Sequence, residues 1–252
     1  MKEDSKIKYK PIITEDGSTT YFSPLYNETC HSLSGAKNET ELHYIKGCQV
    51  QEKAKINSPL NILEVGFGTG LGFLVTKEAL KDNIFHFVSF EIDLELIKIF
   101  ENQQNIQFTQ SANLYHYKAK NYDLSILHGN GRNSVLELTN IIPDFKAHAI
   151  YQDAFSPKRN AILWTKEWFE LLKKLADKDC IMSTYSSSSS IRKSMLQAGW
   201  SLYNGEQFGP KRSSTRACLN QTTSPEIIDK LNRSPVEAIT DLNYLSYTLK
   251  EK

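Results

Sequence analysis

Short apolar runs alternate with longer segments in which apolar residues recur every three or four positions, from residue 60 almost to residue 200. The short runs are typical of buried strands, and the longer spacing is typical of one face of a helix. The pattern predicts strands near 60–65, 85–90, 123–128, 147–153 and 179–185, and helices near 71–81, 93–103, 133–142, 164–175 and 187–198. This alternation favours a doubly wound α/β domain with a parallel sheet.

Two further apolar segments follow the last of these helices. Residues 200–203 and 216–219 are separated by a turn-forming stretch, which predicts a hairpin, antiparallel to the sheet, at its edge. An edge of opposite direction is common on such sheets. A short helix is expected over 225–231. The α/β domain is therefore expected to span residues 59–222, and residues 223–252 to form a C-terminal helix and tail.

The first 58 residues lie outside the alternating pattern. Residues 8–26 alternate around a polar turn at 15–18 and predict a hairpin, and residues 39–51 predict a helix. This N-terminal extension, residues 1–58, must pack on the α/β domain. It either covers the functional site or forms an edge hairpin that only adds stability.

Composition narrows the class of partner. The chain has 30 Lys and Arg residues against 29 Asp and Glu residues, so any nucleic-acid partner must be held by a local basic patch. Its 4 cysteines are scattered without a paired spacing, which indicates free thiols in a reducing compartment and no metal site. The charged start and the lack of a long apolar run predict a cytoplasmic protein without signal peptide or membrane span.

A glycine-rich turn connects the first predicted strand to its helix. Residues 61–72 read NILEVGFGTGLG. Dinucleotide folds use G-x-G-x-x-G/A, but here the sixth position is Leu71 or Phe73, depending on the starting glycine. No Gly-Lys-Ser/Thr follows, so a Walker phosphate loop is also excluded.

An acid precedes this turn by two residues. The pattern Glu64-x-Gly66-x-Gly68-x-Gly70 resembles the first motif of Rossmann-like S-adenosylmethionine methyltransferases, in which the loop passes under the methionine moiety and the ribose. Glycines let the backbone approach a ligand closely. The resemblance predicts that these four residues bind S-adenosylmethionine. A tight strand-to-helix turn without a ligand is the alternative.

Two further strand ends carry polar residues suited to a nucleoside. Glu91 follows the second strand, where an acid can accept hydrogen bonds from ribose hydroxyls. The same acid would suit NAD, or a helix N-terminus. Gly129 and Asn130 follow the third strand, and the side-chain carbonyl oxygen of Asn130 can accept a hydrogen bond from the amino group of adenine. Ligands bind outside the carboxyl ends of such strands, so all three are expected at one site.

The fourth strand ends in a more specific segment. Residues 153–157 read Asp-Ala-Phe-Ser-Pro and are followed by Trp164-Thr165. This combination resembles the methyltransferase domain of the MnmC-type tRNA wobble-uridine modification enzymes, particularly their stand-alone relatives. The glycine loop, the strand before Glu91, the N-terminal Gly35-Ala36-x-x-Glu39 and a serine run at 186–190 agree in order, so the resemblance spans roughly residues 12 to 220.

The resemblance implies methyl transfer from S-adenosylmethionine to the primary amine of 5-aminomethyl(-2-thio)uridine in the tRNA anticodon loop. The family usually has Gly-Asp where this chain has Gly129-Asn130, and Gly-Arg-Lys-Arg where it has Gly-Pro-Lys211-Arg212. The chain is too short to hold the flavin domain of bifunctional members, so neither FAD nor a metal is expected. Another enzyme would have to expose the amine, and no protein partner is evident.

One acid and three aromatic residues are candidates for the chemistry. Asp153 is expected to orient the amine and take its proton, with a helix cap as the alternative. Phe155, Trp164 and Tyr185 are candidates to sandwich the extruded base, because single-stranded RNA is usually read by aromatic stacking. Each of the three could equally belong to the core.

Basic residues near the carboxyl-end loops are candidates for phosphate contacts. They are Lys158, Arg159, Arg192, Lys193, Lys211, Arg212 and Arg216. Scattered surface charge is the alternative. Two other functions stay open: a small-molecule N-methyltransferase with the same donor, and a nucleoside-binding module without catalysis.

Overall fold

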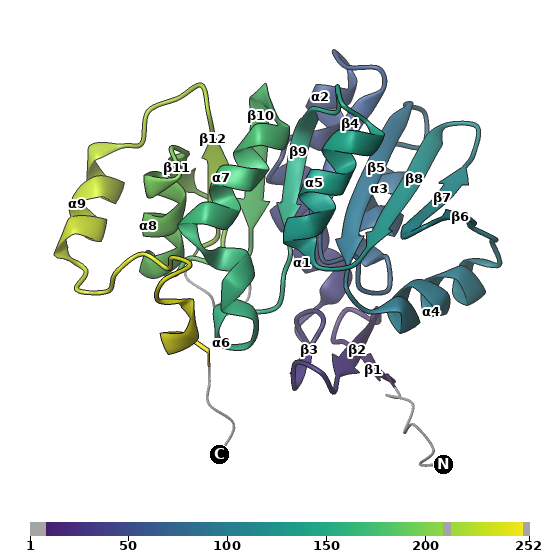
Figure 1. Ribbon diagram of the computed structural model, residues 1–252, viewed down its shortest axis with the longest axis horizontal. Helices are drawn as coiled ribbons and strands as arrows, with labels where there is room; N and C mark the ends of the chain where they lie inside the picture. The colour runs from purple at the N-terminus through teal and green to yellow at the C-terminus, as the bar shows by residue number, and fades with distance from the viewer. Residues whose placement is uncertain (1–8, 209–212, 249–252) are drawn as a thin grey trace.

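A nine-stranded mixed sheet forms the centre of the computed structural model, which describes residues 9–208 and 213–248 (Figure 1). The strand order within the described residues is β11-β12-β10-β9-β4-β5-β8-β7-β6. The five central strands are parallel: β4 (Leu60–Val65), β5 (Phe85–Glu91), β8 (Tyr122–His128), β9 (Ala147–Gln152) and β10 (Ala176–Thr184). The predicted Rossmann-like α/β fold is confirmed, and each predicted strand lies within a few residues of an observed one.

Helices cover both faces of this sheet. Figure 1 shows α5 and α7 in front of the sheet and α3 behind it. The helices that follow the parallel strands are α3 (Leu71–Ala79), α4 (Leu94–Gln104), α5 (Gly131–Ile141), α7 (Lys166–Leu175) and α8 (Ser189–Gln197). Because side chains alternate along a strand, neighbours such as Ile62 and Leu63 enter two separate cores, one on each face.

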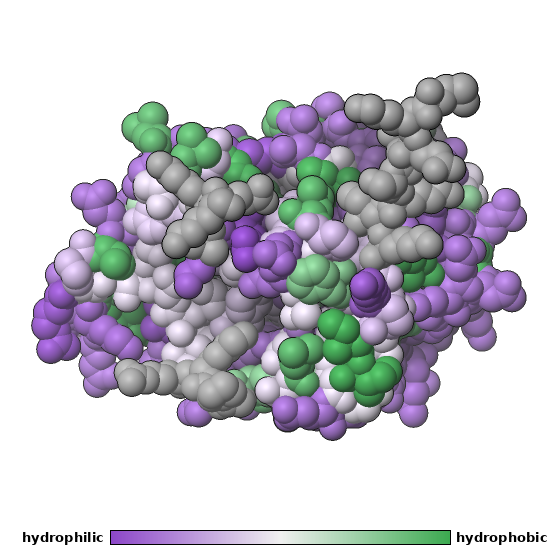
Figure 2. All heavy atoms as spheres, turned by 90° about the horizontal axis from the view of Figure 1, so that it is seen from below, coloured by the Kyte–Doolittle hydropathy of each residue, from purple (hydrophilic) through white to green (hydrophobic). Residues whose placement is uncertain are grey.

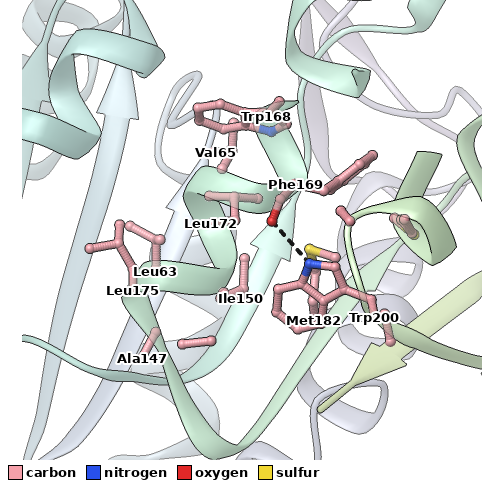
Figure 3. Close-up of a cluster of buried hydrophobic side chains, with 14 of the residues drawn as sticks. Leu63, Val65, Ala147, Ile150, Trp168, Phe169, Leu172, Leu175, Met182 and Trp200 are labelled. Atoms are coloured by element: carbon pink, nitrogen blue, oxygen red, sulfur yellow. Dashed lines mark hydrogen bonds between the residues drawn. The ribbon is translucent and has the colours of Figure 1, made fainter. Parts of the chain in front are cut away.

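The core on the α7 side is rich in large side chains. Figure 3 shows Trp168 and Leu172 of α7 next to Leu63, Val65 and Ile150 of the sheet. Trp200 is also buried in this cluster, and its indole N–H donates to the main-chain carbonyl of Phe169, with an N–O distance of 3.0 Å. This packing fixes α7 on strands β4 and β9, whose carboxyl ends carry predicted site residues.

Both edges of the sheet are antiparallel. The predicted C-terminal hairpin is confirmed as β11 (Ser201–Asn204) and β12 (Thr215–Cys218), with β12 paired to β10. The opposite edge is a hairpin of β6 (Thr109–Ser111) and β7 (Leu114–Lys118), which the pattern does not predict. Its turn uses Ala112 at a φ of 51°, so the glycine or asparagine that usually marks such a turn is missing at that position.

The N-terminal extension forms its own small sheet. Strands β1 (Lys10–Ile13), β2 (Thr19–Ser23) and β3 (Glu28–Thr29) pair in order as an antiparallel sheet. The predicted hairpin is confirmed, and β3 is an addition to it. Figure 1 shows this sheet below the large one, on the side where α6 also lies.

The predicted helix over 39–51 is three pieces. They are α1 (Ala36–Thr40), the π-helix η1 (Glu41–Lys46) and α2 (Val50–Ala54). The helix breaks after η1 because Gln49 adopts a left-handed φ of 55°. Just before it, Gly47 packs so closely on the backbone of His43 and the hydroxyl of Ser183 that no side chain would fit.

The C-terminal part contains one expected helix. It is α9 (Pro225–Arg233), followed by the 3-10 turn η3 (Tyr244–Ser246). The predicted helix over 164–175 starts at Lys166, because Thr165 caps it by accepting the Trp168 N–H. Two short turns precede it, α6 (Pro157–Asn160) and η2 (Ala161–Trp164). Among the described helices, none is long and apolar enough to span a membrane.

Candidate functional site

Three glycines shape the turn after β4. Gly66, Gly68 and Gly70 have φ values of 95°, 54° and 79°, which side chains of L-residues rarely adopt. A Cβ at Gly66 would lie 2.9 Å from the main-chain oxygen of Asp153. At Gly68 a Cβ would point into open space. The loop therefore presents bare backbone to the region outside the strand ends.

That region is a cavity of about 230 Å³, here named the main cavity. It lies at the carboxyl ends of β4, β5, β8 and β9, and the N-terminal extension closes one side of it. Its lining includes residues from all of these elements: Gly66, Gly68, Glu91, Gly129, Asn130, Asp153, Phe155, Tyr26, Cys30 and His31. The structure thus brings most of the predicted nucleoside residues together.

Glu64 and Gly70 are exceptions. The Glu64 carboxylate is only 2% exposed, lies under the glycine loop against Gly72 and accepts a hydrogen bond from the Ser89 hydroxyl at 2.8 Å. Burial raises the pKa of Glu64 well above its usual value. Gly70 starts α3 and packs against the ring of Phe100. Neither residue lines the main cavity; both support the loop from behind, and their direct contact with the methyl donor stays a prediction.

Glu91 lies at the floor of the main cavity. Its carboxylate accepts the backbone N–H groups of Gly68 and Asp93, both at 2.8 Å. Burial raises the pKa of Glu91 to about 7, although these two hydrogen bonds favour the charged form. The side chain therefore ties the glycine loop to β5 and changes charge near neutral pH.

Asn130 has a structural partner at the third strand end. Its side-chain oxygen accepts the Arg132 N–H at 3.0 Å and caps α5. An amide oxygen has two acceptor positions, so the cap leaves room for the predicted hydrogen bond from an adenine. Gly129, at a φ of 150°, turns the chain so that Asn130 lines the cavity.

Asp153 lies between the main cavity and a second one. This side cavity, about 160 Å³, is lined by Asp153 together with Glu28, Glu39, Tyr185 and further residues of the extension and the 153–156 segment. The helix after β9 begins at Pro157 with Ser156 before it. Asp153 is thus separated from this helix, which argues against its alternative role as a helix cap.

The hydroxyl of Tyr44 donates to Oδ1 of Asp153 at 2.6 Å. Tyr44 comes from η1 in the extension, far from Asp153 in sequence. The sequence reasoning missed this residue, and it missed Tyr26, Cys30, His31 and Glu28 in the two cavities. The one available signal was the resemblance of the segment 35–39 to its family counterpart, which pointed to Glu39.

The predicted aromatic residues have different positions. Phe155 lines both cavities and stacks on Tyr26, with ring centroids 4.3 Å apart. Tyr185 lines the side cavity, and its hydroxyl donates to the carbonyl of Ala154 at 2.9 Å. Trp164 is 0% exposed and donates its indole N–H to the carbonyl of Phe155 at 2.8 Å. Trp164 cannot stack on a substrate base, so that prediction is wrong.

The predicted basic patch is only partly described. Lys158 is exposed on α6, with Arg159 next to it. Arg192 is 3% exposed and donates to the Ser214 carbonyl and the Thr215 hydroxyl, so its predicted phosphate contact is wrong. Lys193 donates to the carbonyl of Ser234, and Arg216 lies 3.6 Å from Glu206. Lys211 and Arg212 lie outside the described residues.

Figure 2 views the molecule from below the orientation of Figure 1, the side on which the small N-terminal sheet lies; apolar and hydrophilic side chains both occur near the middle of this face, and hydrophilic ones predominate at its two ends. In the described part of the chain, no group of three or more His, Cys, Asp or Glu residues could hold a metal ion. The polar groups of the site are backbone amides and hydroxyls, which can donate hydrogen bonds, and carboxylates, which accept them; together they suit a nucleoside and an amine.

The family described as S-adenosyl-L-methionine-dependent methyltransferase matches residues 95–220, half of the chain. The chain belongs to this family. The structure of MnmC2 from Aquifex aeolicus resembles this methyltransferase with a TM-score of 0.76 and 29% identity, over 94% of this chain and 79% of that one. Spermidine synthase from Thermotoga maritima, at 14% identity and a TM-score of 0.55, shares the fold.

Curated relatives agree with this assignment. The tRNA 5-methylaminomethyl-2-thiouridine biosynthesis bifunctional protein MnmC of Burkholderia mallei is 26% identical over 229 residues, and that of Burkholderia pseudomallei strain 1106a is 28% identical over 232 residues. Each match covers 80% of this chain and 34% of the relative, so the methyltransferase spans about a third of their length. The resemblance to MnmC-type methyltransferase domains is thereby confirmed, and S-adenosylmethionine is the co-substrate.

Proposed function

We propose that this methyltransferase methylates the primary amine of 5-aminomethyl(-2-thio)uridine at the wobble position of the tRNA anticodon loop. The product is the 5-methylaminomethyl form. The names of the MnmC relatives support this substrate. The observation that carries the proposal is the position of Asp153, which lines both the main cavity at the strand ends and an acidic side cavity. An enzyme of this kind would work in the cytoplasm.

The main cavity suits S-adenosylmethionine. The bare backbone at Gly66 and Gly68 allows close approach of the methionine moiety and ribose. The Glu91 carboxylate lies where it can accept hydrogen bonds from ribose hydroxyls, and the Asn130 oxygen can accept one from the adenine amino group. These four residues are proposed to bind the methyl donor.

The side cavity suits an amine. Its described lining contains the carboxylates of Glu28, Glu39 and Asp153 and no Lys or Arg. Burial lowers the pKa of His31 to about 4, so its ring is neutral at pH 7. Burial and the nearby carboxylates raise the pKa of Tyr185 well above its usual value. All charges on this lining at neutral pH are therefore negative, which favours a ligand that arrives as an ammonium ion.

The proposed reaction needs a neutral amine. The lone pair that forms the new C–N bond, as the C–S bond of the sulfonium breaks, becomes available only when the arriving ammonium loses a proton. Asp153, between the two cavities, is proposed to accept that proton directly or through water. Much of the rate then comes from holding the two reactants in line. The step is a displacement, so it requires neither a metal ion nor a flavin.

Donor binding is expected to weaken at acid pH. Only the ionised carboxylate of Glu91 can accept hydrogen bonds from both ribose hydroxyls. Burial raises the pKa of Glu91 to about 7, so this ionised form is lost as the pH falls below 7. Affinity for S-adenosylhomocysteine should therefore fall about tenfold from pH 8 to pH 6, as measured by isothermal titration calorimetry. Glu91→Gln should bind weakly at both pH values. Binding of NAD in place of S-adenosylhomocysteine would contradict the assignment of the cavity.

The tRNA substrate is tested with labelled S-adenosylmethionine and tRNA from cells blocked at the aminomethyl stage, followed by nucleoside analysis. We expect labelled 5-methylaminomethyl(-2-thio)uridine, and poor methylation of the free nucleoside, because the remote interactions that position the amine are then missing. Lys158→Ala/Arg159→Ala should weaken tRNA binding and lower its salt slope by about one unit for each phosphate that is no longer neutralised. Equal activity on the free nucleoside or a small amine would favour a small-molecule N-methyltransferase.

A further inference from the structure

We propose that Tyr44 is a positioning residue of the methyl-transfer reaction, which holds the Asp153 carboxylate toward the amine. This inference rests on the proposed role of Asp153 as proton acceptor. It makes the N-terminal extension part of the catalytic apparatus as well as a wall of the two cavities.

The geometry at Asp153 carries the proposal. The Tyr44 hydroxyl lies 2.6 Å from Oδ1 of Asp153, a short distance for an O–H donor to a carboxylate. Tyr44 is 2% exposed, and its ring stacks on Tyr151 with centroids 5.0 Å apart. Because Tyr151 belongs to β9, the strand that ends just before Asp153, the phenol and the carboxylate are held by the same strand. A donor on Oδ1 fixes the rotation of the carboxylate.

The protonation of Tyr44 is settled by its surroundings. Burial raises the pKa of Tyr44 well above its usual value, and the charge of Asp153 raises it further. The phenol therefore keeps its proton at any working pH and acts only as a donor. It is not a candidate proton acceptor itself.

A donor is needed here because the neighbourhood of Asp153 is acidic. The titratable groups around Asp153 come from the extension and from the ends of the central strands. From the extension they are Glu28, Cys30, His31, Glu39 and Tyr44, and from the strand ends they are Glu64, Glu91 and Tyr185. Like charges disfavour an ionised carboxylate, whereas a hydrogen bond to it favours the charged form. The Tyr44 bond counteracts the acidic field at the residue that must be ionised to accept a proton.

The local backbone favours a dedicated role over ordinary core packing. Tyr44 lies in a π-helical turn, a form that is rare and frequently found at functional sites. The turn is anchored to β10, because the Ser183 hydroxyl donates to the carbonyl of His43 at 2.5 Å. This anchor places the next residue, Tyr44, against the end of β9.

The test compares Tyr44→Phe with Tyr151→Phe in the full chain. Both replacements remove one buried phenol hydroxyl and keep the ring, but Tyr151 bonds to Thr76 at 3.0 Å, away from the cavities. Tyr44→Phe should lower kcat about 10- to 100-fold, as expected when a hydrogen bond to a charged group is removed. The acid limb of its kcat profile should move to higher pH, with affinity for S-adenosylhomocysteine unchanged. Tyr151→Phe should keep both kcat and profile.

A double variant separates positioning from structure. If Tyr44 acts through Asp153, Tyr44→Phe adds little to the loss already caused by Asp153→Asn. An unchanged kcat and pH profile in Tyr44→Phe, or full additivity with Asp153→Asn, would overturn the proposal. The assay uses whichever amine the wild-type enzyme methylates, so failure of the tRNA assignment leaves this comparison intact.

Discussion

Replacing Asp153 with asparagine is expected to lower kcat by about 10²- to 10⁴-fold, the usual contribution of a positioned acid or base. Asparagine keeps the size of the side chain and can still accept the Tyr44 hydrogen bond, but its amide cannot take a proton from the amine. Affinity for S-adenosylhomocysteine should change little, because Glu91 and the glycine loop remain. Single-turnover methylation and calorimetry measure the two effects separately.

Asp123→Asn is the matched control. Asp123 lies near the start of β8, at the opposite end of the sheet from the cavities, and its carboxylate is 3.3 Å from both His86 and Lys118. Its replacement should leave kcat unchanged. An Asp153→Asn enzyme with the turnover of the wild type would show that Asp153 has only a structural role at the end of β9.

The central fold was predictable because local signals agree with it. The buried parallel strands are apolar on both faces, and the helices between them carry one apolar side each. The hairpin β6–β7 escaped prediction because its residues are mostly exposed or half-buried and its turn has Ala112 at positive φ. The interruption of the helix over 39–51 comes from the left-handed φ of 55° at Gln49, which no local pattern encodes.

The site divides in the same way. Glu91, Asn130 and Asp153 were predicted to share one site because the carboxyl ends of parallel strands meet at one edge of the sheet, and all three line the main cavity. Tyr44 and Tyr26 were not predicted, because they reach the cavities from a separate sheet and helix whose docking is set by tertiary packing. The glycine-loop motif predicted the loop but not which of its residues face the cavity.

The burial of Trp164 leads to a second large effect, on stability. Trp164→Ala is expected to lower the free energy of unfolding by about 3–5 kcal/mol, because a fully enclosed ring is replaced by a void. Trp164→Phe should cost less: it refills most of the void but leaves the carbonyl of Phe155 without its indole donor. Denaturant titrations followed by circular dichroism measure both variants.

Base stacking would give a different result. Removal of a stacking side chain costs about 1–3 kcal/mol in RNA binding and leaves the folded protein intact. Tyr185→Phe is the control for the packing around Trp164. It keeps the edge-to-face contact with the indole ring and removes only the hydrogen bond from the Tyr185 hydroxyl to the carbonyl of Ala154. Weaker tRNA binding by Trp164→Ala at unchanged stability would return Trp164 to the substrate surface. We expect Trp164→Ala to lose stability and Trp164→Phe to lose less. The reason is that the indole N–H of Trp164 holds the main chain of Phe155, in the segment that presents Asp153 and Phe155 to the cavities.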